Sequence, residues 1–263
     1  MSHRTQKIPF SSSATKLIRL SVILMMVGLL SGCKDVNWGW YVVSPFTNTG
    51  QTNLQFLLGG LWNTVLLSFT AIVISVFIGL VVALPSLSTN KHWRMVNRVY
   101  VEAIRAIPIL VLILWVYYGL PVVAGIQINV FWAGVVALAL SDSAFQAEIF
   151  RAGIQSIDKG QTEASHSINL NYPDTLRFVI LPQAIRRVLP ALGNQLVYML
   201  KMSSLVSIIG MQELTRRANE LVVTEYRPLE IYTVLVLEYL VLILIVSAFV
   251  RRLEKKMGAN VSA

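Results

Sequence analysis

Charged residues are scarce in this sequence and make up 13% of its 263 residues, about half the share found in ordinary soluble domains. Cysteine occurs once, at Cys33, which excludes an internal disulfide framework and a metal site built from several thiolates. The three histidines, His3, His92 and His166, lack metal-binding spacing. No glycine-rich phosphate loop of the Walker type and no nucleophile–base arrangement occur, so the chain has neither a nucleotide site nor a catalytic residue of its own.

Apolar residues are abundant instead, and they are gathered in blocks. They make up 55% of the sequence, with a mean hydropathy of +0.64. A helix needs about 20 mostly apolar residues to span the hydrocarbon core. The blocks lack the alternation of barrel strands, so helices are the structure that satisfies their backbone in lipid. The sequence predicts an all-α membrane protein with five spans, at about Phe56–Leu84, Ala103–Gly125, Asn129–Phe150, Val188–Gly210 and Leu229–Val250.

A shorter apolar stretch, Leu17–Leu30, follows several basic residues near the N-terminus. A charged segment followed by an apolar one is the layout of a secretory signal. The stretch ends in Leu30-Ser31-Gly32-Cys33, which resembles the lipobox of bacterial lipoproteins, where the cysteine is lipidated. Two interpretations stay open: residues 1–33 are a cleaved signal that leaves a lipidated Cys33, or they form an uncleaved anchor helix. Both place residues 34–55 outside the cytoplasm as a linker.

The basic residues indicate how the chain is oriented. A net charge of +9 is compatible with nucleic-acid binding, but the lysines and arginines lie in connectors between apolar blocks, so no nucleic-acid partner is expected. Those after the first span, in segment 151–187 and in the C-terminal region all fall on one side. Because positive loops stay in the cytoplasm, we predict a multi-pass protein of the bacterial cytoplasmic (inner) membrane, surrounded by lipid, with a cytoplasmic tail at residues 258–263.

The longest polar segment between predicted spans runs from Arg151 to Arg187. A loop of this length in a compact protein is usually functional or disordered. It contains too many apolar residues for a solvated linker. We therefore expect two short amphipathic helices, divided near residues 169–173. Pro173 suits the first turn of the second helix, and Asn171 suits its N-cap.

Motifs in this loop and beyond it carry a family resemblance. Glu163-Ala164-Ser165 is followed by Asn169 and by a Val-Ile-Leu-Pro sequence at residues 179–182. This resembles the Glu-Ala-Ala, glycine and Ile-x-Leu-Pro pattern of permeases of ATP-binding cassette importers. Further motifs resemble the branch that takes up polar amino acids, of the histidine, glutamine and arginine type. They are GLWNT at 60–64, RAIP at 105–108, AEIFRAG at 147–153, LPQAIRR at 181–187 and LK with SSLVSIIG at 200–210.

The resemblance covers about Phe56–Met257, the predicted transmembrane permease domain (56–257), and implies its fold and partners. The implied fold is the five-helix core of the type I importer permeases, with an N-terminal anchor helix or signal segment added. The implied partners are a cytoplasmic ATPase subunit, an extracytoplasmic solute-binding protein, and a second permease copy or sister permease. No cofactor is expected on this chain, since ATP is used by the partner subunit.

The resemblance also assigns the loop 151–187 to coupling with the ATPase. A coupling helix is expected at about Gly160–Asn171, where small residues allow close approach and a carboxylate near the N-terminus suits the helix dipole. Serine and asparagine depart from the family pattern at two positions, although asparagine tolerates the left-handed turn that glycine would make. The residues assigned to coupling are Gly160, Glu163, Ala164, Ser165, Asn169, Leu181 and Pro182.

Three ionisable residues, Asp142, Lys201 and Glu238, lie inside predicted spans. A charge there costs at least about 2.5 kcal/mol, so such residues normally face the bundle interior or a wet path. One hypothesis is that they line the translocation path of a zwitterionic or charged solute. The other is that they make structural contacts between helices.

Two further functional readings remain open on the residues alone. A gradient-driven secondary transporter or channel would also be rich in apolar helices, but it predicts inverted repeats, and no clear repeat is found. A membrane-anchored lipoprotein or scaffold would explain Cys33 without explaining five spans. The resemblance favours the permease subunit of an ATP-driven importer that moves a polar amino acid, basic ones included, or a related small solute.

Overall fold

The computed structural model describes residues 38–88 and 90–256. The predicted signal or anchor segment with Cys33, the start of the linker and the tail at 258–263 lie outside the described residues. The chain divides into two units after Gly39, and the account below concerns the described residues from Trp40 onward.

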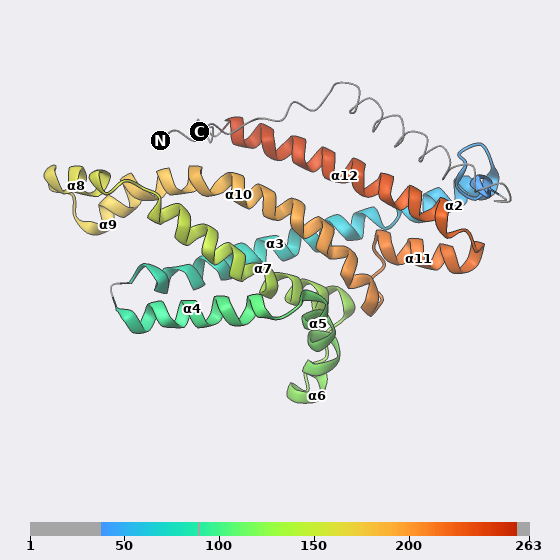
Figure 1. Ribbon diagram of the computed structural model, residues 1–263, viewed down its shortest axis with the longest axis horizontal. Coiled ribbons are helices and arrows are strands. Elements are labelled where there is room, and N and C mark those ends of the chain that lie inside the picture. Colours follow the sequence, from blue (N-terminus) through green and yellow to red (C-terminus); the bar gives the residue numbers. More distant parts are fainter. Residues whose placement is uncertain (1–37, 89, 257–263) are drawn as a thin grey trace, which may run out of the picture. The chain divides into compact units, whose positions relative to one another are not determined.

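All regular elements in this part of the chain are helical (Figure 1). The α-helices are joined by short 3-10 and π segments that continue the same path in several places. The α-helices are α2 (Asn48–Leu58), α3 (Leu61–Ala83), α4 (Lys91–Ala106), α5 (Ile109–Leu114), α6 (Leu120–Ala124), α7 (Val130–Gln155), α8 (Lys159–Ser167), α9 (Tyr172–Asp174), α10 (Leu181–Met202), α11 (Leu214–Glu225) and α12 (Pro228–Lys256). The other segments are η1 (Trp40–Val43), η2 (Leu84–Leu87), η3 (Trp115–Gly119, π), η4 (Thr175–Ile180, π) and η5 (Ser203–Ile209).

Three helical stretches of the described chain are long and apolar enough to cross a membrane, and they contain α3, α7 and α12. Helices α4 and α5–α6 are bent by 93° at the break between them, and they add a fourth crossing only if the two parts together form one broken span. The fourth predicted span, Val188–Gly210, falls in α10 and η5. Helix α10 has 22 residues and is about 33 Å long at 1.5 Å per residue. Its first turns carry Arg186 and Arg187, so its apolar character is weaker.

The second predicted span differs most from the structure. The helix begins at Lys91 rather than near Ala103, and it ends at Ala106. Ile107 has the extended angles φ −86° and ψ 122°, because the ring of a following proline, here Pro108, disfavours the helical conformation. The apolar run therefore starts in one helix and continues in another.

Helix α7 lies at the centre of the described bundle (Figure 1). It packs against α3, α4 and α10, whereas α12 packs on α10 and α11. The most extensive contact, between α7 and α3, depends on Gly79, where an added Cβ would collide with the Cβ of Gln146. The apolar core around this contact includes Leu67, Ile113 and Leu138, all fully buried.

Part of the predicted extracytoplasmic linker is also helical. Thr47 caps α2 by accepting a hydrogen bond from the Gly50 N–H at 3.1 Å. Leu57 packs with Leu221 and Ile231, which ties α2 to α11 and α12. This small cluster lies at the opposite end of α12 from its basic C-terminal residues (Figure 1).

Candidate functional site

A helix, α8, lies where the resemblance places the coupling helix, although it is shorter than expected. Asp158 caps it by accepting from the Gly160 N–H at 2.6 Å, which satisfies one of the free N–H groups of a helix start. The helix ends at Ser167 rather than Asn171. Glu163 and Ala164 are exposed at its centre. Both side chains are therefore accessible from outside the chain, and their role in coupling stays a prediction.

Ser165, the first departure from the family pattern, is buried, with 3% of its surface exposed. Its hydroxyl lies 2.7 Å from the Thr162 carbonyl oxygen and 3.0 Å from the Thr175 hydroxyl oxygen, which is also buried. Because one hydroxyl has one proton, donation to Thr162 leaves the Thr175 hydroxyl to complete the second bond. The Ser165 hydroxyl, which the alanine of the family pattern lacks, thus links α8 to the segment that contains Thr175.

Asn169, the second departure, adopts the left-handed conformation with φ of 60°. It reverses the chain after α8. The Asn169 N–H donates to the His166 carbonyl at 2.9 Å, and the Leu170 N–H donates to the Ser165 carbonyl at 3.1 Å. Asparagine is one of the few residues other than glycine that adopt this conformation routinely. The turn expected at a glycine in the family is therefore formed here by asparagine.

The second short helix predicted in the loop is not a separate element. Asn171 does cap a helix, accepting from the Asp174 N–H at 2.9 Å. That helix, α9, continues through the π segment η4 into α10. Leu181 and Pro182 are exposed in the first turn of α10. The π segment η4 lies just before this proline, which has no N–H to donate to a carbonyl one turn earlier.

Contacts fix the loop to the ends of α7 and α10. Ile157, Ile180 and Ala184 form a small apolar cluster. The Gln183 side chain donates to Gln161 of α8 at 3.1 Å, and Arg187 donates to the Ser156 carbonyl. Helix α8 is therefore attached to both long helices and is not a free loop (Figure 1).

Asp142 lies in the bundle interior and is 2% exposed. Its Oδ1 atom accepts from Gln195 Nε2 of α10 at 2.6 Å, and its Oδ2 atom accepts from Gln146 Nε2 at 2.9 Å and from Ser75 of α3. One carboxylate thus joins three helices. The sequence contains one signal for this network, the spacing of four residues between Asp142 and Gln146 in one helix.

Lys201 and Glu238 lie elsewhere. Lys201 is exposed near the C-terminal end of α10. Glu238 is half-buried in α12, and its Oε2 atom is buried with no hydrogen-bond partner among the described residues. No hydrogen bond or ion pair within the described chain joins Asp142, Lys201 and Glu238 to one another. Their shared role in a translocation path stays a prediction.

Residues 75–259 match the family described as "Binding-protein-dependent transport system inner membrane component". The chain belongs to this family. Within it, the chain is 35% identical to the arginine transport system permease protein ArtQ of Bacillus subtilis (strain 168) over 207 residues, covering 79% of this chain and 94% of that protein. It is 41% identical to the glutamine transport system permease protein GlnP of Escherichia coli (strain K12) over 160 residues, covering 60% and 73%.

Solved structures show the same fold. A crystal structure of an amino acid ABC transporter with histidines matches with a TM-score of 0.73 and 41% identity, over 78% of this chain and 96% of that one. The MetNI methionine ABC transporter in an inward-facing conformation matches with a TM-score of 0.66 at 23% identity, which supports the fold alone. These findings confirm the all-α fold of the importer permeases and the predicted resemblance to ATP-binding cassette permeases.

Proposed function

We propose that this chain forms the path for a polar amino acid in an ATP-driven importer and receives the ATPase's motion through α8. The observation that carries the proposal is the construction of α8. Its centre, with Glu163 and Ala164, is exposed. Two side-chain hydrogen bonds hold its other side, one between Ser165 and Thr175 and one between Gln161 and Gln183. A helix exposed on one side and anchored on the other transmits a push from a partner to α10.

The substrate class follows from the relatives. Their names specify arginine and glutamine, and the 41% identical structure is an amino acid transporter with histidines. A polar amino acid carries a carboxylate and an ammonium group, which need polar partners inside a bundle. Asp142, Lys201 and Glu238 are the ionisable side chains that we propose for this path, alone or together with the subunit that completes it.

The proposed assembly has four kinds of component. The chain binds no cofactor itself, and ATP is hydrolysed by an ATPase docked on the loop 151–187 in the cytoplasm. A solute-binding protein delivers the amino acid from the other side of the inner membrane. A second permease copy or a sister permease completes the path. Exposed apolar residues along α12, such as Val236, Val241 and Ile245, supply surface for lipid or this second permease.

Site-specific photo-cross-linking in membranes tests the docking. A photoreactive residue at Ala164 should cross-link to an ATPase subunit, because this side chain is exposed at the centre of α8. The matched control is Tyr226, also exposed but beyond the C-terminal end of α11, where no ATPase product is expected. Equal cross-linking from both positions, or none from Ala164, would contradict the proposal.

A further inference from the structure

Helix α4 has a basic side and an apolar side. Lys91, Arg94, Arg98 and Arg105 recur at intervals of three, four and seven residues and so share one face of the helix. The opposite face carries Trp93, Val96 and Val99, which are 57%, 56% and 55% exposed. An amphipathic helix with exposed apolar residues beside a cationic face is typical of a membrane interface.

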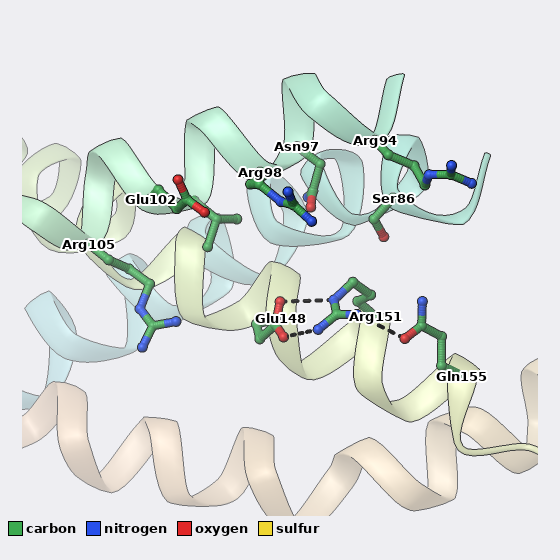
Figure 2. A pocket seen from close by; sticks show the side chains of 10 residues that line it. Ser86, Arg94, Asn97, Arg98, Glu102, Arg105, Glu148, Arg151 and Gln155 are labelled. Atoms are coloured by element: carbon green, nitrogen blue, oxygen red, sulfur yellow. Dashed lines mark hydrogen bonds and ion pairs between the residues drawn. The ribbon is translucent and has the colours of Figure 1, made fainter. Parts of the chain in front are cut away.

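The basic face of α4 borders a pocket of about 330 Å³ against α7 (Figure 2). Its charged lining consists of four arginines and two glutamates, a formal excess of two positive charges. They are Arg94, Arg98, Glu102 and Arg105 of α4 and Glu148 and Arg151 of α7. Arg94 and Arg98 also line an open hollow of about 410 Å³ on the surface of α4, formed by residues of this helix alone.

Arg94 and Arg98 have few partners within the described chain, whereas Arg105 lies over the Phe145 ring and interacts electrostatically with Glu148. Glu148 is already paired with Arg151, and Arg151 also donates to Gln155 at 2.9 Å. Arg94 makes one long bond, at 3.3 Å, to the Ser88 carbonyl. No hydrogen bond or ion pair to Arg98 is found within the residues that the structure describes. The Arg98 guanidinium group and the N–H groups of Arg94 that do not bond to Ser88 are therefore available to an anion.

The pocket is rigidly framed and lies where the apolar runs end. Asn97 of α4 donates to the Val82 carbonyl of α3 at 2.7 Å, and Tyr100 lies 2.7 Å from Ser143 of α7 through their hydroxyl oxygens. Ser86, beyond the end of α3, lines the pocket. An arginine cluster at this level can meet lipid headgroups without entering the hydrocarbon core.

We propose that this pocket binds the phosphate of an anionic phospholipid, with Arg94 and Arg98 as its principal ligands. Guanidinium groups match phosphate oxygens through paired, charge-assisted hydrogen bonds. A soluble phosphate has the same chemistry, but the exposed Trp93, Val96 and Val99 on the other face of α4 are apolar surface typical of a helix at the membrane interface, where phospholipid headgroups supply the phosphate. The site is independent of the proposed docking at α8.

Lipid binding by the full-length chain in nanodiscs tests this site. Wild-type protein should retain phosphatidylglycerol in preference to phosphatidylcholine, measured by native mass spectrometry and by titration with short-chain lipid. Each basic residue contributes about 1 kcal/mol to attraction for anionic lipid, so the double variant Arg94→Gln/Arg98→Gln should bind phosphatidylglycerol about thirtyfold more weakly. The double variant Arg94→Lys/Arg98→Lys keeps the charge but loses the paired guanidinium hydrogen bonds, so its affinity should lie between those of the wild type and the glutamine variant. An affinity equal to that of the wild type would overturn the assignment of these two arginines as paired phosphate ligands.

The matched control is the double variant Arg251→Gln/Arg252→Gln, which removes the same charge from two exposed positions in α12. It should leave retention unchanged. Equal losses in the pocket and control variants would show general attraction to the membrane and overturn the site. No preference for phosphatidylglycerol in the wild type would overturn it without reference to any variant. Displacement of the lipid by millimolar inorganic phosphate would assign the pocket to a soluble anion instead.

Discussion

Replacing Ser165 and Thr175, singly and together, tests whether their hydrogen bond holds α8 against α10. The two hydroxyl oxygens are 3.0 Å apart, and both residues are buried. Thr175 begins the π segment that leads into α10. The pair is thus a direct polar link between the exposed helix and a long bundle helix.

The structure sets different costs for the two single changes. Thr175→Val leaves the Ser165 hydroxyl bonded to the Thr162 carbonyl at 2.7 Å, so the loss is that of one hydrogen bond, about 1 kcal/mol. Ser165→Ala leaves the buried Thr175 hydroxyl without this partner and should cost about 1–3 kcal/mol. The double variant removes both polar groups, so it should cost less than the two single costs together, with a coupling energy of about 1 kcal/mol.

Amide hydrogen exchange over residues 160–170 measures this coupling. The Leu170 N–H bonds to the Ser165 carbonyl, so its protection reports local opening of α8. An opening free energy lowered by about 1 kcal/mol speeds exchange about fivefold. Each single variant should show at least that acceleration, and the double variant should be no faster than Ser165→Ala. Strictly additive effects would refute the direct bond, and unchanged exchange would refute its contribution to holding α8.

Asp142→Ala should lower the free energy of unfolding in detergent by about 1–3 kcal/mol. It removes the hydrogen bonds that Asp142 accepts from α3 and α10, and interhelical hydrogen bonds in membranes contribute about 0.6–1.7 kcal/mol each. Gly79→Val should lower thermal stability by at least about 1–3 kcal/mol, since the new side chain meets Gln146. Asn169→Val should destabilise the turn after α8 by about 1–2 kcal/mol, seen as faster local hydrogen exchange, whereas Asn169→Gly should not. Burial raises the pKa of the Glu213 carboxyl group. The stability that this group contributes is therefore lost as the pH rises from the ordinary carboxyl pKa through the raised pKa of the folded state. Glu213→Gln should flatten the stability–pH curve in that interval.

Each of these predictions has a control or an opposing result. Thr70→Val removes an exposed hydroxyl that bonds within its own helix and should leave stability unchanged; equal losses in Thr70→Val and Asp142→Ala would contradict the network. Normal stability of Gly79→Val would mean that α3 and α7 do not pack as closely as described. Equal exchange in Asn169→Val and Asn169→Gly would argue against the left-handed turn. A pH curve unaltered by Glu213→Gln would exclude that carboxyl as its cause.

The helices could be predicted because long apolar runs require helical backbone in lipid. The break at Ile107–Pro108 falls inside a predicted span because the apolar run continues across it, although the proline itself marks the boundary. The basic start of α4 was missed for a related reason: its polar face makes it amphipathic rather than apolar.

The site was predictable where it depends on adjacent residues and not where it depends on distant ones. Glu163 and Ala164 lie exposed on a helix, as the motif indicates. The contact between Ser165 and Thr175 depends on the chain reversal at Asn169, which brings two buried hydroxyls together. Gln195 is 53 positions from its partner Asp142, and sequence spacing contains no signal for such a pair.

ATP-dependent amino acid uptake by proteoliposomes containing the assembled importer tests the central claim most directly. Glu163→Ala changes an exposed side chain at the centre of α8, so the chain should remain folded while uptake is largely lost and the ATPase is bound more weakly. Glu254→Ala, near the C-terminal end of α12, should transport as the wild type does. Full uptake with the ATPase still bound to the Glu163→Ala protein would contradict the coupling role of α8.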